Sequence, residues 1–186
     1  MKEVLISIRP KWCELIANGK KTVEVRKTRP KIETPFKCYI YCTLPRKKVI
    51  GEFVCDYITH IKKRGIDNNF DYCYLSLDVF GNDDIEVEIS DIKTSCVEKD
   101  ELNFYGSNSN ELYAWHISDL KIYDEPKELS EFYKEDFHEA LSMYEDLFSI
   151  GVPTGCVVKY PPEPKKEDYV LKRPPQSWCY CEEVEE

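Results

Sequence analysis

Short runs of alternating apolar and polar residues constrain the fold of this chain more than any other feature. A period of two places every second side chain on the same face of an extended strand. Strands that follow one another this closely predict a small β-barrel. The alternation runs through residues 4–9, 22–26, 36–43 and 49–58, and Gly51 is expected to form a bulge in the last of these.

A short helix is predicted between the first two strands. Pro10 suits a first helical turn, where its missing N–H costs nothing. Trp12 and Ile16 share one face at helical spacing, and Gly19 lies where a left-handed C-terminal cap belongs. The pattern therefore predicts a helix over residues 10–18.

The rest of the chain mixes both patterns. Apolar residues recur every three or four positions from 129 to 150, which predicts an amphipathic helix. We expect one domain, residues 1–186, with a helical insertion at 129–169. The predicted fold is α+β: a small β-barrel with short flanking helices. Further strands are expected at 72–80, 84–90, 111–126 and in the final QSWCYCEE, with a short helix at 95–105 and a proline-rich connector at 161–168.

The charge is unevenly distributed. Residues 1–50 hold 13 Lys/Arg and 4 Asp/Glu, whereas the remainder holds 13 and 31, and the formal net charge is −9. Such a chain does not coat nucleic acid by charge alone, but it can carry a local basic site. The other reading is that these cations are solvated or paired with the acidic remainder.

Composition also predicts the compartment. The longest apolar runs are shorter than the ~20 residues that span a bilayer, and the first residues lack the features of a signal peptide. Nine cysteines are an odd number, and several lie in strand-like stretches, so we expect reduced thiols. We therefore predict a cytoplasmic protein without membrane association, cofactor or metal.

The candidate site lies in ANGKKTVEVRKTRP, residues 17–30, where lysines and arginines surround one glutamate. Lys21 can hold a phosphate as a cation or, if burial lowers its pKa, act as a base. Glu24 and Arg26 project from one strand face about 6–7 Å apart. They either bracket a ligand or form a structural ion pair, and nearby cations favour the ionised carboxylate.

Other residues are candidates because they flank this stretch or stack on bases. Trp178 is the preferred aromatic residue, since it follows Gln176 after two prolines. A ring that stacks on a nucleobase contributes about 1–3 kcal/mol, although tryptophans also commonly fill a core. The additional ligand-binding candidates are Ser7, Arg9, Lys20, Thr22, Trp115, Gln176 and Trp178.

A strand, a proline-led helix and the motif G-x-K-x-x-E-x-R, here Gly19, Lys21, Glu24 and Arg26, resemble the signature of ASCH-domain proteins. The segments ISIRPKWCELIANG, YAWHISDLKIYDEPKEL and RPPQSW are also similar to that family. The resemblance implies a PUA-like barrel with a cleft beside the first helix and second strand. It also implies binding of RNA or of a modified nucleobase, nucleoside or nucleotide.

Two alternatives stay open. Some ASCH relatives are amidohydrolases that act on N4-acetylcytidine and carry K-x-x-T, whereas here Glu24 replaces the threonine. If this chain is an enzyme, Lys21 and Glu24 are the catalytic candidates, with Glu24 activating water, or with Thr22 or Ser7 within about 3 Å of Lys21. The second alternative is a protein-interaction adaptor that uses the helix at 129–150, although that apolar stripe can equally pack on the parent barrel. The sequence identifies no protein partner.

Overall fold

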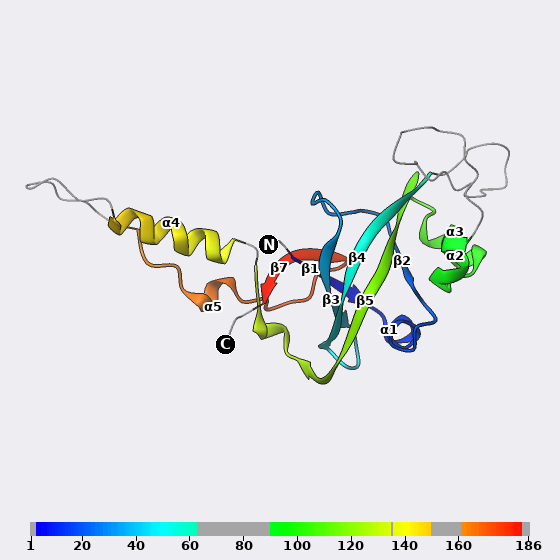
Figure 1. Cartoon of the computed structure of the whole chain (residues 1–186), viewed down its shortest axis with the longest axis horizontal. Helices are drawn as coiled ribbons and strands as arrows, with labels where there is room; N and C mark the ends of the chain where they lie inside the picture. The colour runs from blue at the N-terminus through cyan, green and yellow to red at the C-terminus, as the bar shows by residue number, and fades with distance from the viewer. Residues whose placement is uncertain (1–2, 63–89, 135, 150–160, 184–186) are drawn as a thin grey trace, which may run out of the picture.

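The computed structural model describes residues 3–62, 90–134, 136–149 and 161–183. These residues form a twisted seven-stranded sheet with short helices around it (Figure 1), so the α+β class is confirmed. The strands are β1 (Glu3–Ile8), β2 (Val23–Arg26), β3 (Phe36–Cys42), β4 (Lys48–Lys62), β5 (Glu111–Lys127), β6 (Phe132–Lys134) and β7 (Trp178–Glu183). The helices are α1 (Pro10–Ala17), α2 (Ser90–Ser95), α3 (Lys99–Tyr105), α4 (Phe137–Ser149) and α5 (Lys166–Tyr169), with a 3-10 turn at Leu129–Glu131.

The predicted closed barrel is wrong for the described strands. Their order is β2-β5-β4-β3-β1-β7-β6, and no ladder between described residues joins β2 to β6. The strand expected in QSWCYCEE is present as β7, but it pairs with β1 and with β6 and so extends the sheet instead of closing a barrel. Among the described strand pairs, β1 and β3 run parallel and the others are antiparallel.

Both faces of the sheet carry buried side chains. Ile6 and Ile8 pack on one face with Ile16 of α1, which covers that face through its apolar side. Leu5 is also 0% exposed, because it packs on the opposite face with Phe132 of β6. β1 is therefore buried on both faces, whereas alternation alone predicted a half-buried strand.

Local signals in the first sixty residues are confirmed. Pro10 begins α1, and Gly19 follows the helix with φ of 73°, a left-handed conformation that favours glycine. Gly51 lies at a register shift between β4 and β5. A side chain at Gly51 would collide with the carbonyl oxygen of Lys121, so the close approach of the two strands requires glycine.

The middle and the end of the chain differ from expectation. The helix expected at 95–105 begins later, as α3, and α2 was not expected; Cys96, whose φ is 55°, lies between the two helices. The expected strands at 72–80 and 84–90 lie outside the described residues, except Ser90, which begins α2.

The helical pattern at 129–150 holds only for α4. Phe132 forms part of β6, because its ring is 0% exposed and packs 4.8 Å from the ring of Tyr39. α4 and α5 lie to one side of the sheet, beyond β6 and β7 (Figure 1). The insertion at 129–169 and the adaptor role stay predictions; α4 does expose Met143 and Leu147. Within the described ranges, the helices are too short or too polar to cross a membrane.

Candidate functional site

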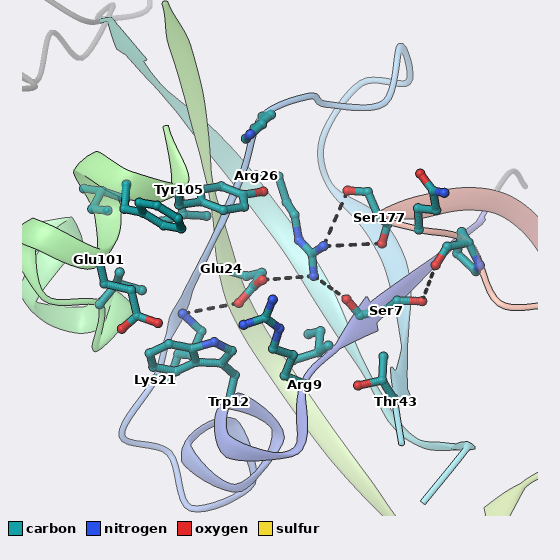
Figure 2. A pocket seen from close by; sticks show the side chains of 18 of the residues that line it. Ser7, Arg9, Trp12, Lys21, Glu24, Arg26, Thr43, Glu101, Tyr105 and Ser177 are labelled. Carbon is teal, nitrogen blue, oxygen red and sulfur yellow. Dashed lines mark hydrogen bonds and ion pairs between the residues drawn. The ribbon is translucent and has the colours of Figure 1, made fainter. Parts of the chain in front are cut away.

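A pocket of about 730 Å³ lies where β1, α1, β2 and α3 meet the segment before β7 (Figure 2). β1 contributes Ser7 and the loop after it contributes Arg9, while the segment before β7 contributes Gln176 and Ser177. The pairing of β7 with β1 brings these distant parts of the sequence together. The backbone N–H of Ser7 donates to the carbonyl oxygen of Ser177 at 2.9 Å, and its hydroxyl donates to that of Pro175 at 2.7 Å.

Three charged side chains form a buried row along the floor of this pocket (Figure 2). Glu24 lies in the centre, with Oε2 3.2 Å from Nζ of Lys21 and Oε1 3.0 Å from the guanidinium of Arg26. Lys21 is 1% exposed, Glu24 is 6% exposed and Arg26 is 7% exposed. A buried carboxylate is costly without partners, and this row supplies two.

Further hydrogen bonds fix the two cations of the row. Nζ of Lys21 donates to the carbonyl oxygen of Ser95 at 2.5 Å, which ties β2 to the end of α2. The guanidinium of Arg26 donates to the carbonyl oxygen of Ser7 at 2.6 Å, which ties β2 to β1. Glu24 Oε2 is buried and has no hydrogen bond of good geometry with a described residue, so Lys21 is its ion-pair partner.

Positive charge exceeds negative charge around the pocket. Arg9 and Lys27 are exposed, and neither forms an ion pair with a described residue. Glu101 lies on the other wall and pairs with Lys11 at 3.6 Å. Four cations and two acids line the pocket: Arg9, Lys21, Arg26 and Lys27, with Glu24 and Glu101.

Three aromatic side chains complete the walls. Trp12 of α1 lies with its ring 5.0 Å from Nζ of Lys21, and Phe104 and Tyr105 project from α3. Phe104 is 83% exposed, which is unusual for a phenylalanine on the wall of a pocket. Burial raises the pKa of the Tyr105 hydroxyl above its usual value, against the opposing effect of Arg26. Tyr105 is therefore a hydrogen-bond donor at neutral pH.

The structure brings six of the predicted site residues together and leaves four outside the pocket. Ser7, Arg9, Lys21, Glu24, Arg26 and Gln176 line it. Lys20 and Thr22 are exposed next to it but do not line it. Trp115 is 0% exposed and packs edge-on against Phe36 in the core. Trp178 donates its indole N–H to the hydroxyl of Thr28 at 2.9 Å, away from the pocket.

Phe104, Tyr105 and Ser177 were not singled out from the sequence, and Trp12 was not the preferred tryptophan. Phe104 and Tyr105 carried a usable signal. Adjacent residues of a helix point about 100° apart, so two neighbouring rings on so short a helix do not both face the core. Among the described residues, no cluster of His, Cys, Asp and Glu suited to holding a metal ion is present.

Comparison with known proteins finds similarity to the ASCH domain. A family model of the ASCH domain matches residues 6–72. An ASCH domain-containing ribonuclease from Zymomonas mobilis is 44% identical over 50 residues, which are 27% of this chain and 34% of that protein. The match thus spans about a third of the relative's length.

Solved structures support the fold. The crystal structure of ASCH from Zymomonas mobilis has a TM-score of 0.51 at 18% identity and covers 82% of this chain and 83% of its own. A mutant of that protein has a TM-score of 0.52 at 17% identity, over 96% of this chain and 87% of its own. These likenesses show a shared fold. Residues 6–72 therefore match the ASCH domain, in agreement with the resemblance of the motifs.

Proposed function

We propose that the pocket between α1, β2 and α3 binds a nucleotide of single-stranded RNA. The observation that carries this proposal is the combination of excess positive charge and three aromatic rings in one pocket of a chain with a net charge of −9. Single-stranded nucleic acids are bound by this combination, because cations hold the phosphates and rings stack on the bases. The name of the ribonuclease relative supports RNA as the ligand.

The residues take different parts in this proposal. Arg9 is exposed and has no ion-pair partner among the described residues, so its guanidinium is available to a phosphate. Trp12, Phe104 and Tyr105 offer ring faces to a base. Glu24 lines the pocket and accepts a hydrogen bond from an N–H group of the base, such as the imino group of uracil or an exocyclic amine.

Lys21 and Arg26 act mainly as positioning residues for Glu24. Both already donate hydrogen bonds to backbone carbonyl oxygens, and both are buried. Glu24 neutralises one of the two positive charges, so the row as a whole carries one positive charge. Removal of Arg9 therefore reduces the ionic contribution to binding more directly than removal of either row cation.

Fluorescence anisotropy with a labelled oligoribonucleotide at several salt concentrations tests this function. Arg9→Ala is expected to weaken binding and to reduce the slope of log K against log salt by about 0.7, the value for one phosphate contact on a single strand. Lys165→Ala is the matched control, because Lys165 is exposed on the connector before α5. Absence of RNA binding, or an equal effect of both substitutions, would refute the proposal.

A second candidate function is cleavage of the bound RNA. Glu24 Oε2 is buried, lacks a hydrogen bond of good geometry and lies beside the ammonium of Lys21. A carboxylate that accepts a proton and cations that stabilise developing negative charge are groups used in phosphodiester cleavage. Denaturing gels of labelled RNA check this candidate, with Glu24→Gln, whose amide oxygen is still a hydrogen-bond acceptor, expected to lose cleavage. Cleavage that persists in Glu24→Gln would contradict it.

The amidohydrolase alternative has less support from the geometry. Thr22 does not line the pocket, and the hydroxyl of Ser7 already donates to the carbonyl oxygen of Pro175. Release of acetate from N4-acetylcytidine by the wild type, lost in Lys21→Ala, would restore it.

A further inference from the structure

A second group of cations follows the pocket along the segment that joins β2 to β3, the blue trace at one end of the sheet in Figure 1. Lys27, Arg29 and Lys31 are exposed, and none forms an ion pair with a described residue. Three neighbouring cations that lack an acidic partner among the described residues are available to an outside anion. Four lysines of the sheet do pair: Lys37 with Glu3 and Glu52, Lys48 with Glu128, Lys121 with Glu52, and Lys127 with Glu183.

Arg29 stands between two hollows. The larger one, about 700 Å³, is lined by residues 29–34 together with Tyr57 and Ile58. The smaller one, about 200 Å³, is lined by Arg29, Ile58, His60 and Tyr113. Both hollows thus share a cation and one apolar side chain.

Ring contacts hold the side chains around these hollows. The guanidinium of Arg29 lies 6.0 Å from the centre of the Tyr113 ring. The ring of His60 also stacks on Tyr113, with the two ring centres 5.0 Å apart. Tyr57 stacks on His116 with ring centres 3.7 Å apart and is still 54% exposed. A supported and exposed ring beside an unpaired arginine is suited to a base and its phosphate.

The segment is also fixed to the sheet rather than loosely attached. The indole N–H of Trp178 donates to the hydroxyl of Thr28 at 2.9 Å, and the backbone N–H of Lys31 donates to the hydroxyl of Tyr180 at 2.7 Å. Both anchors belong to β7, which also pairs with β1 beside the pocket. Groups fixed before binding lose less entropy when a ligand arrives.

The two regions are continuous along the chain. Arg26 and Lys27 line the first pocket, and Arg29 lines the second. Lys27 and Arg29 are two positions apart, and two residues of extended chain span about 7 Å. Consecutive nucleotides of one RNA strand can therefore reach from the pocket to the hollow beside Arg29.

We infer that residues 27–31 and Tyr57 form a second subsite, which binds the part of a single-stranded RNA that extends beyond the pocket. Arg29 and Lys31 bind phosphates, and Tyr57 stacks on a base. This inference rests on the proposed function, because it takes the strand in the pocket to be RNA.

Affinity as a function of RNA length tests the subsite. Uridine dinucleotide and decauridylate are compared as competitors in an anisotropy assay with the full chain. The double substitution Arg29→Ala and Lys31→Ala is expected to weaken decauridylate binding about tenfold at low salt and to reduce its salt slope by about 1.4, for two phosphates on a single strand. The dinucleotide should bind unchanged, because it fits within the pocket. Arg9→Ala should weaken both ligands.

Two further comparisons separate the subsite from general attraction between charges. The double substitution Lys165→Ala and Lys166→Ala removes the same charge from exposed positions and should leave both affinities unchanged. Tyr57→Ala should weaken decauridylate binding about tenfold, whereas Tyr57→Phe, which retains the ring, should not. Inorganic polyphosphate should compete more weakly than decauridylate.

These experiments distinguish a failure of the subsite from a failure of the proposed function. If Arg9→Ala weakens RNA binding but the Arg29 and Lys31 substitutions have no effect on decauridylate, the subsite is wrong and the pocket assignment stands. Equal competition by polyphosphate, or no effect of Tyr57→Ala, also overturns the nucleotide subsite. If the wild type binds neither RNA, both the subsite and the proposed function are wrong.

Discussion

Replacement of Lys21 by methionine removes the ammonium from the buried row and retains a side chain of similar length. The wild-type ammonium donates to the carbonyl oxygen of Ser95 at 2.5 Å and lies 3.2 Å from Glu24. It is 1% exposed, so water does not replace either partner. The substitution therefore removes the Lys21 donor from the carbonyl oxygen of Ser95 and leaves a buried carboxylate with one cation instead of two.

The size of the effect follows from these contacts. Loss of one partner of a buried ion pair typically costs about 3–5 kcal/mol, and a hydrogen bond to a charged group contributes about 1.5–3 kcal/mol. Glu24 keeps Arg26 at 3.0 Å, so the cost should lie below the upper range. We expect Lys21→Met to lower the free energy of unfolding by about 2–3 kcal/mol.

Urea unfolding followed by tryptophan fluorescence measures this change. With a slope of about 2 kcal/mol per molar urea, the midpoint should fall by about 1–1.5 M. Lys20→Met is the matched control, because the adjacent Lys20 is exposed, and its effect should stay within about 0.5 kcal/mol. Equal midpoints for the two variants would show that the buried row does not stabilise the fold and would refute this reasoning.

Three further predictions follow from the same structure. Gly51→Ala should destabilise the protein by about 1–3 kcal/mol in the same assay, because the added Cβ meets the Lys121 carbonyl oxygen. Gly19→Ala has open space around it and should cost only about 1 kcal/mol, from its positive φ. A larger loss of stability in Gly19→Ala than in Gly51→Ala would contradict the bulge. Phe104→Ala should leave the urea midpoint unchanged, since the ring is 83% exposed, but weaken RNA binding about tenfold; unchanged binding would remove Phe104 from the site. Burial raises the pKa of the Tyr105 hydroxyl above 10.0, so this hydrogen-bond donor is lost only at higher pH. The difference in RNA affinity between wild type and Tyr105→Phe should therefore stay constant from neutral pH to about pH 9. A difference that disappears below pH 9 would contradict the raised pKa.

Local sequence signals predicted the elements around the pocket well. The proline-led helix, the left-handed Gly19 and the alternation of β2 each depend on a few neighbouring residues, and all are present in the structure. The same alternation placed Glu24 and Arg26 on one face, where they now form an ion pair.

Features set by distant contacts were not predictable in this way. Whether the sheet closes depends on which edge β7 joins, and alternation within a strand does not specify its neighbours. Phe132 follows the helical spacing of the next residues, yet tertiary packing against Tyr39 places it in β6. Trp178 had polar neighbours typical of a binding surface, but its indole serves to anchor Thr28.

Nuclear magnetic resonance of the three tryptophan indole N–H groups tests the central claim most directly. Trp12 lines the pocket, whereas Trp115 is buried in the core. Titration with uridine dinucleotide should shift the indole resonance of Trp12, assigned through Trp12→Phe, and leave that of Trp115 in place. A saturating titration that leaves the Trp12 resonance unmoved would contradict RNA binding in this pocket.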